Sequence, residues 1–564
     1  MTLSKEIYDA VVKAFGDAFV TQRSASAQTT TTSADGANEE GDETSTESVQ
    51  ASAAASTTTT TTTTTSASDE AVIIELPTRT ALIADMMAGL EPSSAECGQM
   101  TRAAVAEFTR LNGREPTEEE ATRGQTATFE SYVTARLRYA RSFLAHPRVK
   151  MFVAMFDRGS PPAKFPEQNT RYGSDSDDVA SDGEVAEVLA GSMLPHEWKR
   201  FRGNPRFRDA VMSMLVASLI ATPLERGKKL CIVGNPTTPR NESHYPVIYE
   251  AGAAPVRITT PSSCNDYFEA DFGVVHMATE MVRLKFNAVV RAIDGDTLLA
   301  LMLNAPRTVT CVDSFQTALQ AQYAAMRACA SPPKRARTGE APVPGAETQS
   351  SSSRSPPPPP AWTHKVYMLR EMPGSRSLID IQSLYMLANG PAAAHIVGHS
   401  TRPRCLPELV TAVAMLLGND YAIKFMPRVG GKTLLKAFRE LADEMSTLVT
   451  STPARTLAED LRNAHEIRVS RSTLQRLVDH LYQSKGMAAL KPSSQRIDVA
   501  TAILEYALNY FANAPNTHVP PVDAYARAPS GLSLHGFEWI NPELPPTRLN
   551  ARLAERVHVE GRFV

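Results

Sequence analysis

Residues 151–171 read M-F-V-A-M-F-D-R-G-S-P-P-A-K-F-P-E-Q-N-T-R, and this stretch decides the fold. Six mostly apolar residues end on Asp157, and an Arg-Gly pair and two prolines follow, which predicts a buried strand that breaks into a loop. Ligands of open α/β sheets bind at the carboxyl ends of the strands, which is where Asp157 falls. Lys164 and Arg171 follow at seven-residue steps, about two helical turns, so on a helix they share a face. One acid beside two cations could bind a metal ion and a phosphate group. A strand end with two solvated basic residues is the simpler interpretation of this stretch alone.

The bulk composition indicates a multidomain globular protein. A length of 564 residues favours two to four domains, and a hydrophobic content of 42% is enough for a sizeable core. We expect no membrane span, because no run of 18 or more apolar residues occurs, and the N-terminus lacks the order of a secretory signal. The six cysteines form no C-x-x-C pair, which argues against a zinc site and a disulfide framework and indicates a reducing compartment.

The net charge of −3 conceals a basic remainder. Residues 35–47 and 175–187 each hold six acids and no Lys or Arg, so the rest of the chain carries −3 + 12 = +9. A basic folded part is compatible with a polyanionic partner.

Several further apolar patterns indicate alternating strands and helices. Residues 81–84, A-L-I-A, predict a core strand that ends on Asp85, although an acid at a helix N-terminus is an alternative interpretation. Short strands are also predicted at 230–233, 255–259 and 365–369, and helices at 5–20, 100–111, 131–144, 208–220 and 408–417. Such alternation is typical of an α/β sheet with covering helices.

More acids stand at the ends of predicted elements. Glu269 and Asp271 open a predicted helix, where two acids are often only a match to the helix dipole. Asp294 and Asp296 flank Gly295 after a strand; on an extended chain they project to one side, but a D-G turn in a hairpin is the alternative. Asp420 follows the helix predicted at 408–417.

A glycine turn opens the next helix. Gly430, Gly431, Lys432 and Thr433 suggest a nucleotide-binding P-loop, but that loop needs a glycine where Met426 stands. We expect a helix, a tight turn and a second helix, whose free amides can hold a phosphate. A plain helical hairpin is the alternative.

Two inserts and a basic motif complete the pattern. Lys334, Arg335 and Arg337 fit a short nuclear import signal in a flexible linker. Composition and periodicity divide the chain into an N-terminal helix (1–23), a disordered Ser/Thr/acidic insert (24–70), an N-terminal core region (71–173), a disordered acidic insert (174–190), an internal core region (191–329), a disordered linker (330–361), the end of the core with the helix–turn–helix (362–440) and a helical C-terminal extension (441–564).

Taken in chain order, these pieces resemble the flap endonuclease family of structure-specific 5′ nucleases. The pieces are A-L-I-A-D; F-D-R-G-S-P-P-A-K with Arg171; F-E-A-D; I-D-G-D-T-L-L; and L-L-G-N-D-Y followed by V-G-G-K. The resemblance covers most of the chain outside the inserts. Arg158 and Arg428 stand where the family pattern has glycine.

The resemblance implies a PIN-like α/β fold: a central, mostly parallel sheet flanked by helices, an H3TH-type helix–turn–helix element and a helical C-terminal region. It implies two Mg²⁺ ions, for which Mn²⁺ can substitute, since oxygen ligands suit both. The first ion is assigned by resemblance to Asp85, Asp157, Glu269 and Asp271, and the second to Asp294, Asp296 and Asp420. Lys164 and Arg171 are expected to act on the scissile phosphate, and Gly430, Gly431 and Lys432 to bind the DNA backbone.

The function expected is two-metal hydrolysis of flap or branched DNA in replication, repair or recombination. One alternative is an endoribonuclease like the virion host shutoff protein of herpesviruses, which cuts mRNA; another is an inactive scaffold that keeps the fold. We expect a monomer in the nucleus, or the host nucleus if the chain is viral, as its long inserts indicate. No convincing sliding-clamp motif is present.

Overall fold

The computed structural model is described here for 5–16, 19–23, 76–86, 90–122, 124–156, 179–235, 246–257, 270–292, 294–305, 364–372, 375–400, 405–418, 426, 428–452 and 466–512. A nine-stranded sheet lies at its centre. In spatial order the strands are β1 (Phe19–Arg23), β9 (Ser375–Asp380), β8 (Val366–Met372), β7 (Asn287–Arg291), β2 (Thr80–Asp85), β3 (Val149–Met155), β4 (Lys229–Val233), β5 (Val247–Glu250) and β6 (Val256–Arg257).

The five middle strands, from β8 to β4, pair in parallel, and antiparallel strands close both edges. The middle strands are nearly continuous apolar runs, such as T-A-L-I-A-D in β2 and V-K-M-F-V-A-M in β3. Such runs are typical of parallel strands that are buried on both faces. The prediction of a mixed α/β fold with a mostly parallel central sheet is therefore confirmed.

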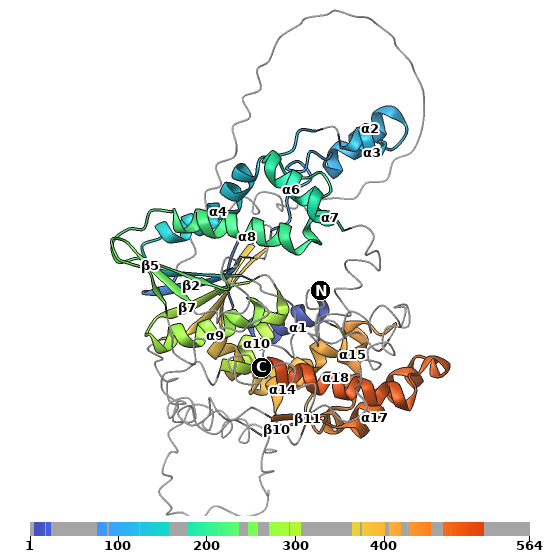
Figure 1. The fold of residues 1–564 in the computed structure, drawn as a ribbon. Helices are drawn as coiled ribbons and strands as arrows, with labels where there is room; N and C mark the ends of the chain where they lie inside the picture. The colour runs from blue at the N-terminus through green and yellow to red at the C-terminus, as the bar shows by residue number, and fades with distance from the viewer. Residues whose placement is uncertain are drawn as a thin grey trace, which may run out of the picture.

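Helices cover both faces of the sheet (Figure 1). One face, called face A here, is the face of Ile83, Val290 and Met368, and the opposite face B is that of Leu82, Val289 and Leu369. The hydrophobic core on face A also contains buried residues of helices, some of which pack on other helices and not on the sheet itself: α1 (Lys5–Ala14), α9 (Ala270–Arg283), α10 (Gly295–Asn304), α12 (Ile381–Ala388), η7 (Pro391–Ala393), α13 (Ala394–Val397), α14 (Leu406–Leu416), α15 (Gly431–Glu440), α16 (Ala442–Met445), α17 (Arg471–Ser484) and α18 (Ser494–Ala512), with η8 (Ala488–Leu490) between the last two.

Face B has a smaller cover, made of α4 (Phe129–Ala145), α6 (Asp182–Gly191), α7 (Trp198–Arg202) and α8 (Pro205–Ile220). Aromatic rings fill this layer: the centroid of Trp198 lies 5.3 Å from that of Tyr132 and 5.2 Å from that of Phe207. By contrast, α2 (Arg102–Asn112) buries no side chain, and it lies with α3 (Glu118–Ala121) away from the sheet in Figure 1.

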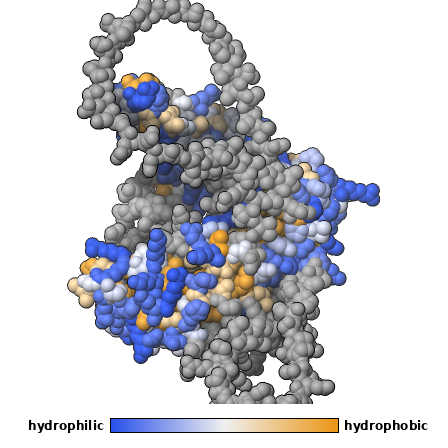
Figure 2. Space-filling model, turned by 180° about the vertical axis from the view of Figure 1, so that it is seen from behind, coloured by the Kyte–Doolittle hydropathy of each residue, from blue (hydrophilic) through white to orange (hydrophobic). Residues whose placement is uncertain are grey.

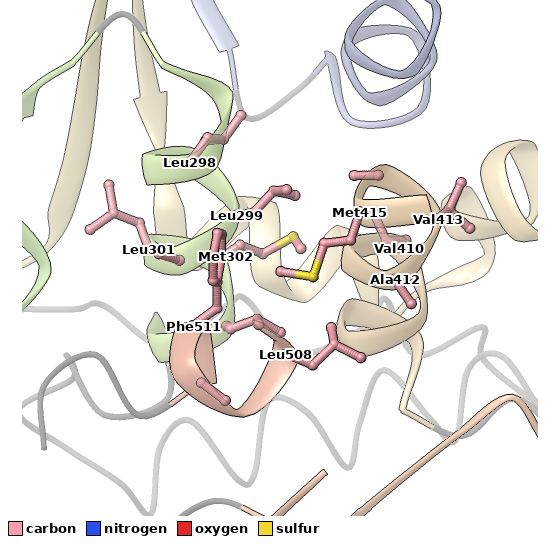
Figure 3. Close-up of a cluster of buried hydrophobic side chains, with 14 of the residues drawn as sticks. Leu298, Leu299, Leu301, Met302, Val410, Ala412, Val413, Met415, Leu508 and Phe511 are labelled. Atoms are coloured by element: carbon pink, nitrogen blue, oxygen red, sulfur yellow. The ribbon is translucent and has the colours of Figure 1, made fainter. Parts of the chain in front are cut away.

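The core of face A joins α10 to α14 and α18. Figure 3 shows Leu299 and Met302 of α10 facing Met415 of α14, with Leu508 and Phe511 of α18 beneath them. A hydrogen bond adds to this packing, because buried Asn304 donates from Nδ2 to the carbonyl oxygen of Phe511 at 2.7 Å. The described parts of 441–512 therefore share one hydrophobic core with the sheet.

The expected helix over 5–20 is too long at its C-terminal end. Helix α1 ends at Ala14, and residues 19–23 form β1, the edge strand beside β9. The apolar residues at helical spacing agree with α1. The sequence V-T-Q-R of β1 does not indicate a strand by itself, because its partner strand β9 lies more than 350 residues away in the chain.

The expected disordered insert at 174–190 is wrong for residues 182–190, which belong to α6. Ser181 and Glu184 form a capping box at the start of this helix, and Glu184 also pairs with Arg200. The acids at its N-terminus match the helix dipole, so the acidic composition here marks a helix start.

The expected helical C-terminal extension at 441–564 contains a short antiparallel pair, β10 (Val449–Thr452) and β11 (Glu466–Val469). Ile467 of this pair is buried in the core of face A. The β-branched residues of the two segments favour strands over helices. The expected disordered stretches at 24–70 and 330–361 lie outside the described residues, as do Lys334, Arg335 and Arg337.

The described helices include none that is both long and apolar enough to cross a lipid bilayer. On the side that Figure 2 shows, hydrophilic residues dominate the coloured surface and hydrophobic ones appear in smaller areas among them.

Candidate functional site

Acidic residues follow the carboxyl ends of two adjacent parallel strands. Asp85 is the last residue of β2, and Ala84 lies opposite Arg291, the last residue of β7. The chain leaves β7 and reaches Asp294 three residues later, at the start of α10. The structure therefore brings Asp85 and the N-terminus of α10 to one edge of the sheet, where ligand sites of α/β folds form.

Asp294 and Asp296 do not lie on an extended chain or in a hairpin turn, so both sequence-based interpretations of this pair are wrong. Asp294 is the N-cap of α10, with extended backbone angles, and its side chain accepts a hydrogen bond from the amide of Asp296 at 3.3 Å. Asp296 lies in the first turn and is only 2% exposed. The apolar run that follows is the buried helix α10, since T-L-L-A-L-M-L buries every residue against face A and its neighbouring helices.

The other acids are only partly within the described structure. Asp271 lies in the first turn of α9, as expected, although its side chain is not described. The remaining predicted site residues lie outside the described residues: Asp157, Lys164, Arg171, Glu269 and Asp420. Within the part of the chain that the structure describes, no three Asp, Glu, His or Cys side chains lie close enough to hold a metal ion.

Face B carries an ionic network next to this edge. Arg291 pairs with Glu371 of β8 at 2.7 Å, and Glu371 also pairs with Arg376 of β9 at 3.1 Å. The guanidinium of Arg291 lies 4.1 Å from the ring centroid of Tyr139. Burial raises the pKa of Tyr139 to about 12, and the negative charges of Asp85 and Glu371 add to the rise while Arg291 opposes it. The phenol is thus a neutral donor, and it donates to Sδ of Met86 at 3.1 Å.

Face A carries a residue that the sequence analysis missed. Ala292 directly follows β7, and it lies opposite Arg370 of β8 because Arg291 lies opposite Leu369. Asp85, Ala292 and Arg370 thus occupy one row across three neighbouring strands. Arg370 is 8% exposed, and its guanidinium lies 3.6 Å from the ring centroid of Tyr8 on α1. The signal was in the sequence: Val366, Met368 and Arg370 alternate as inward residues, and a charge at such a position is unusual.

The glycine turn lies at the start of α15. Gly430 is the N-cap without a side-chain cap, Gly431 is buried and Lys432 is exposed. Arg428 has a φ of 62°, a left-handed conformation that glycine adopts more easily, and its carbonyl accepts a hydrogen bond from Nζ of Lys485 at 3.3 Å. An exposed lysine beside uncapped amides is able to bind an anion.

Comparison with known proteins gives little beyond this geometry. No family model matches the chain, and no curated protein matches it. Among solved structures, the chain is similar to the crystal structure of the T5 D15 protein co-crystallised with metal ions. The match has 11% identity and a TM-score of 0.27, and it covers 84% of this chain and 99% of the other. A likeness this distant carries no argument about activity.

Proposed function

We propose that this chain is a divalent-metal-dependent nuclease that hydrolyses phosphodiester bonds of flap or branched DNA. One observation carries the proposal: Asp85 and the Asp294–Asp296 helix start lie at the carboxyl ends of adjacent parallel strands. The order of sequence motifs adds Asp157, Glu269, Asp271 and Asp420 to the same site as proposed ligands.

The described donors fit a hard divalent cation. They are carboxylates only, and one of them, Asp296, is almost completely buried. Carboxylates gathered in a buried place raise one another's pKa unless a cation neutralises them, and oxygen donors suit Mg²⁺ or Mn²⁺. When bound, two such ions would supply Lewis-acid activation of a water and of the phosphate oxygens.

The chain's own residues would supply orientation and charge. Asp294 would be held in place by its capping bond to the amide of Asp296. Lys164 and Arg171 are proposed to neutralise charge on the scissile phosphate. The turn at Gly430–Lys432 is proposed to bind the backbone of a duplex away from the cut, which positions the substrate without reading its sequence.

The test is cleavage of labelled 5′-flap DNA, linear duplex DNA and single-stranded RNA by the full chain, with Mg²⁺ or with EDTA. The proposal expects Mg²⁺-dependent cutting that favours the flap. Cutting of RNA alone would replace it with the host-shutoff-type endoribonuclease. No cutting of any of the three with either Mg²⁺ or Mn²⁺ would leave the inactive scaffold as the explanation.

A further inference from the structure

Arg370 lies in the same row of the sheet as Asp85. The row follows from the strand register, in which Ala84 lies opposite Arg291 and Arg291 lies opposite Leu369. The next residues along the three strands are Asp85, Ala292 and Arg370, in that order. Neighbouring strands are about 4.8 Å apart, so the Cα atoms of Asp85 and Arg370 are roughly 10 Å apart. The residue between them, Ala292, projects only a methyl group.

The side chains of this row point to face A. Successive residues of a strand alternate between faces, and Ile83, Val290 and Met368, each two residues earlier, belong to the core of face A. Helix α10 also packs on face A, so Asp294 and Asp296 start on the same side of the sheet. Arg370 is therefore a cation on the acidic side of the carboxyl edge, unlike Arg291, which lies on face B.

Arg370 lacks a carboxylate partner within the described part of the chain. It is 8% exposed, its Nε has no hydrogen-bond partner, and its described contact is with the ring of Tyr8. A buried charge of this kind is costly, and native structures usually pair it. By contrast, Arg291 and Arg376 on the neighbouring strands β7 and β9 both pair with Glu371.

Because Arg370 stacks on Tyr8, the N–H donors of its guanidinium remain available to bind an anion. A cation that lies over an aromatic ring uses its face, while its N–H donors point outward in the guanidinium plane. Those donors match two oxygens of a phosphate group, and burial strengthens such charge-assisted bonds. A phosphodiester over Ala292 would meet the carboxylates on one side and Arg370 on the other.

We propose that Arg370 binds a phosphate oxygen of the nucleic-acid substrate and that Tyr8 holds its guanidinium in position. This inference rests on the proposed nuclease function. It also gives the N-terminal helix α1 a role in substrate binding, although residues 24–75, which lie outside the described structure, separate β1 from Leu76.

The test uses the full chain with fluorescein-labelled 5′-flap DNA. Cleavage is measured with Mg²⁺, binding is measured by anisotropy with Ca²⁺ in place of Mg²⁺, and unfolding is followed by heating without metal. Arg370→Met should lower kcat/KM by roughly 10²-fold, the usual effect of losing one preorganised donor to a developing or bound anion. Its binding should weaken by roughly tenfold, and Arg370→Lys should recover part of both because it keeps the charge without the planar fork.

Matched controls separate this role from a structural one. Arg376→Met removes the same charge from the next strand on face B and should cleave within about twofold of wild type. Tyr8→Leu should lose part of the activity because the stacking surface is gone, and Tyr8→Phe, which keeps the ring, should lose less than Tyr8→Leu. The unfolding midpoint of Arg370→Met should stay the same or rise, since a buried cation without a carboxylate partner is removed.

Two results would overturn the inference while leaving the nuclease in place. One is cleavage and binding by Arg370→Met that equal those of Arg376→Met. The other is a lowered unfolding midpoint with no recovery by Arg370→Lys, which would make Arg370 structural. If wild type cuts none of the nucleic acids, the proposed function itself fails and this inference falls with it.

Discussion

Asp294 is both a helix cap and a proposed metal ligand, and substitution can separate the two roles. As the N-cap of α10 it accepts one hydrogen bond of 3.3 Å, which is long, so the cap should contribute about 0.5–1 kcal/mol, the lower part of the usual range. Asparagine caps a helix as well as aspartate does, so Asp294→Asn should unfold in EDTA within about 0.5 kcal/mol of wild type. Asp294→Ala should lose the cap as well.

Cleavage should respond differently, because only the carboxylate can serve as a ligand. If losing one ligand removes about 3 kcal/mol of the stabilisation that a bound ion gives the transition state, both variants should cleave roughly 10²-fold more slowly than wild type. Mg²⁺ should also raise the unfolding temperature of wild type more than that of Asp294→Asn. The assay is heat unfolding with and without Mg²⁺ beside single-turnover flap cleavage. Wild-type cleavage by Asp294→Asn, with loss only in Asp294→Ala, would refute the ligand role and leave a helix cap.

Three further outcomes are expected elsewhere in the chain. Lys432→Ala should weaken duplex binding for all sequences alike and reduce the salt dependence by about one unit, as measured by anisotropy across a salt series; an unchanged slope would remove the turn from the DNA interface. Asn304→Ala should cost about 1–3 kcal/mol by losing the bond to Phe511, and limited proteolysis should then release α18 sooner than in wild type. The backbone amide and hydroxyl of Ser181 and the guanidinium of Arg200 lower the pKa of Glu184 from 4.5 to about 2, so its stabilisation is present above pH 4.5 and is lost as the pH falls towards 2. Between pH 6 and pH 3, the unfolding midpoint of Glu184→Gln should therefore fall less than that of wild type; an equal fall would contradict the assignment.

Strong local patterns in the sequence were enough to predict the central elements. The apolar runs around Ile83 and Val153 correspond to β2 and β3 in the structure. The helix patterns that end near Ile220 and Leu417 correspond to α8 and α14. These segments combine a clear period with terminal signals, such as Asn204 and Pro205 at the start of α8. The carboxyl-edge position of Asp85 followed directly from its place at the end of such a run.

The rest depended on long-range contacts. The stretch after Asp294 is apolar at every position, and a buried helix and a buried strand look alike when no period distinguishes them. Strand β1 forms because it can pair with the edge strand β9. Helix α6 forms because Ser181 and Glu184 cap its N-terminus, although its composition is that of an acidic insert. The alternation of Val366, Met368 and Arg370 is visible in the sequence, but only the register places Arg370 in the row of Asp85 and only the fold brings α1 over it.

We propose that the carboxylates that follow β2 and β7 are essential for Mg²⁺-dependent phosphodiester hydrolysis. Asp85→Asn tests it most directly, because the substitution keeps the size of the side chain at the end of β2 and removes its charge. The measurement is the rate of 5′-flap cleavage across a Mg²⁺ titration for wild type and for this variant. Wild type should cleave only with Mg²⁺, and the variant should cleave at least roughly 10²-fold more slowly at every Mg²⁺ concentration. Equal rates for the two proteins, or cleavage that persists in EDTA, would contradict it.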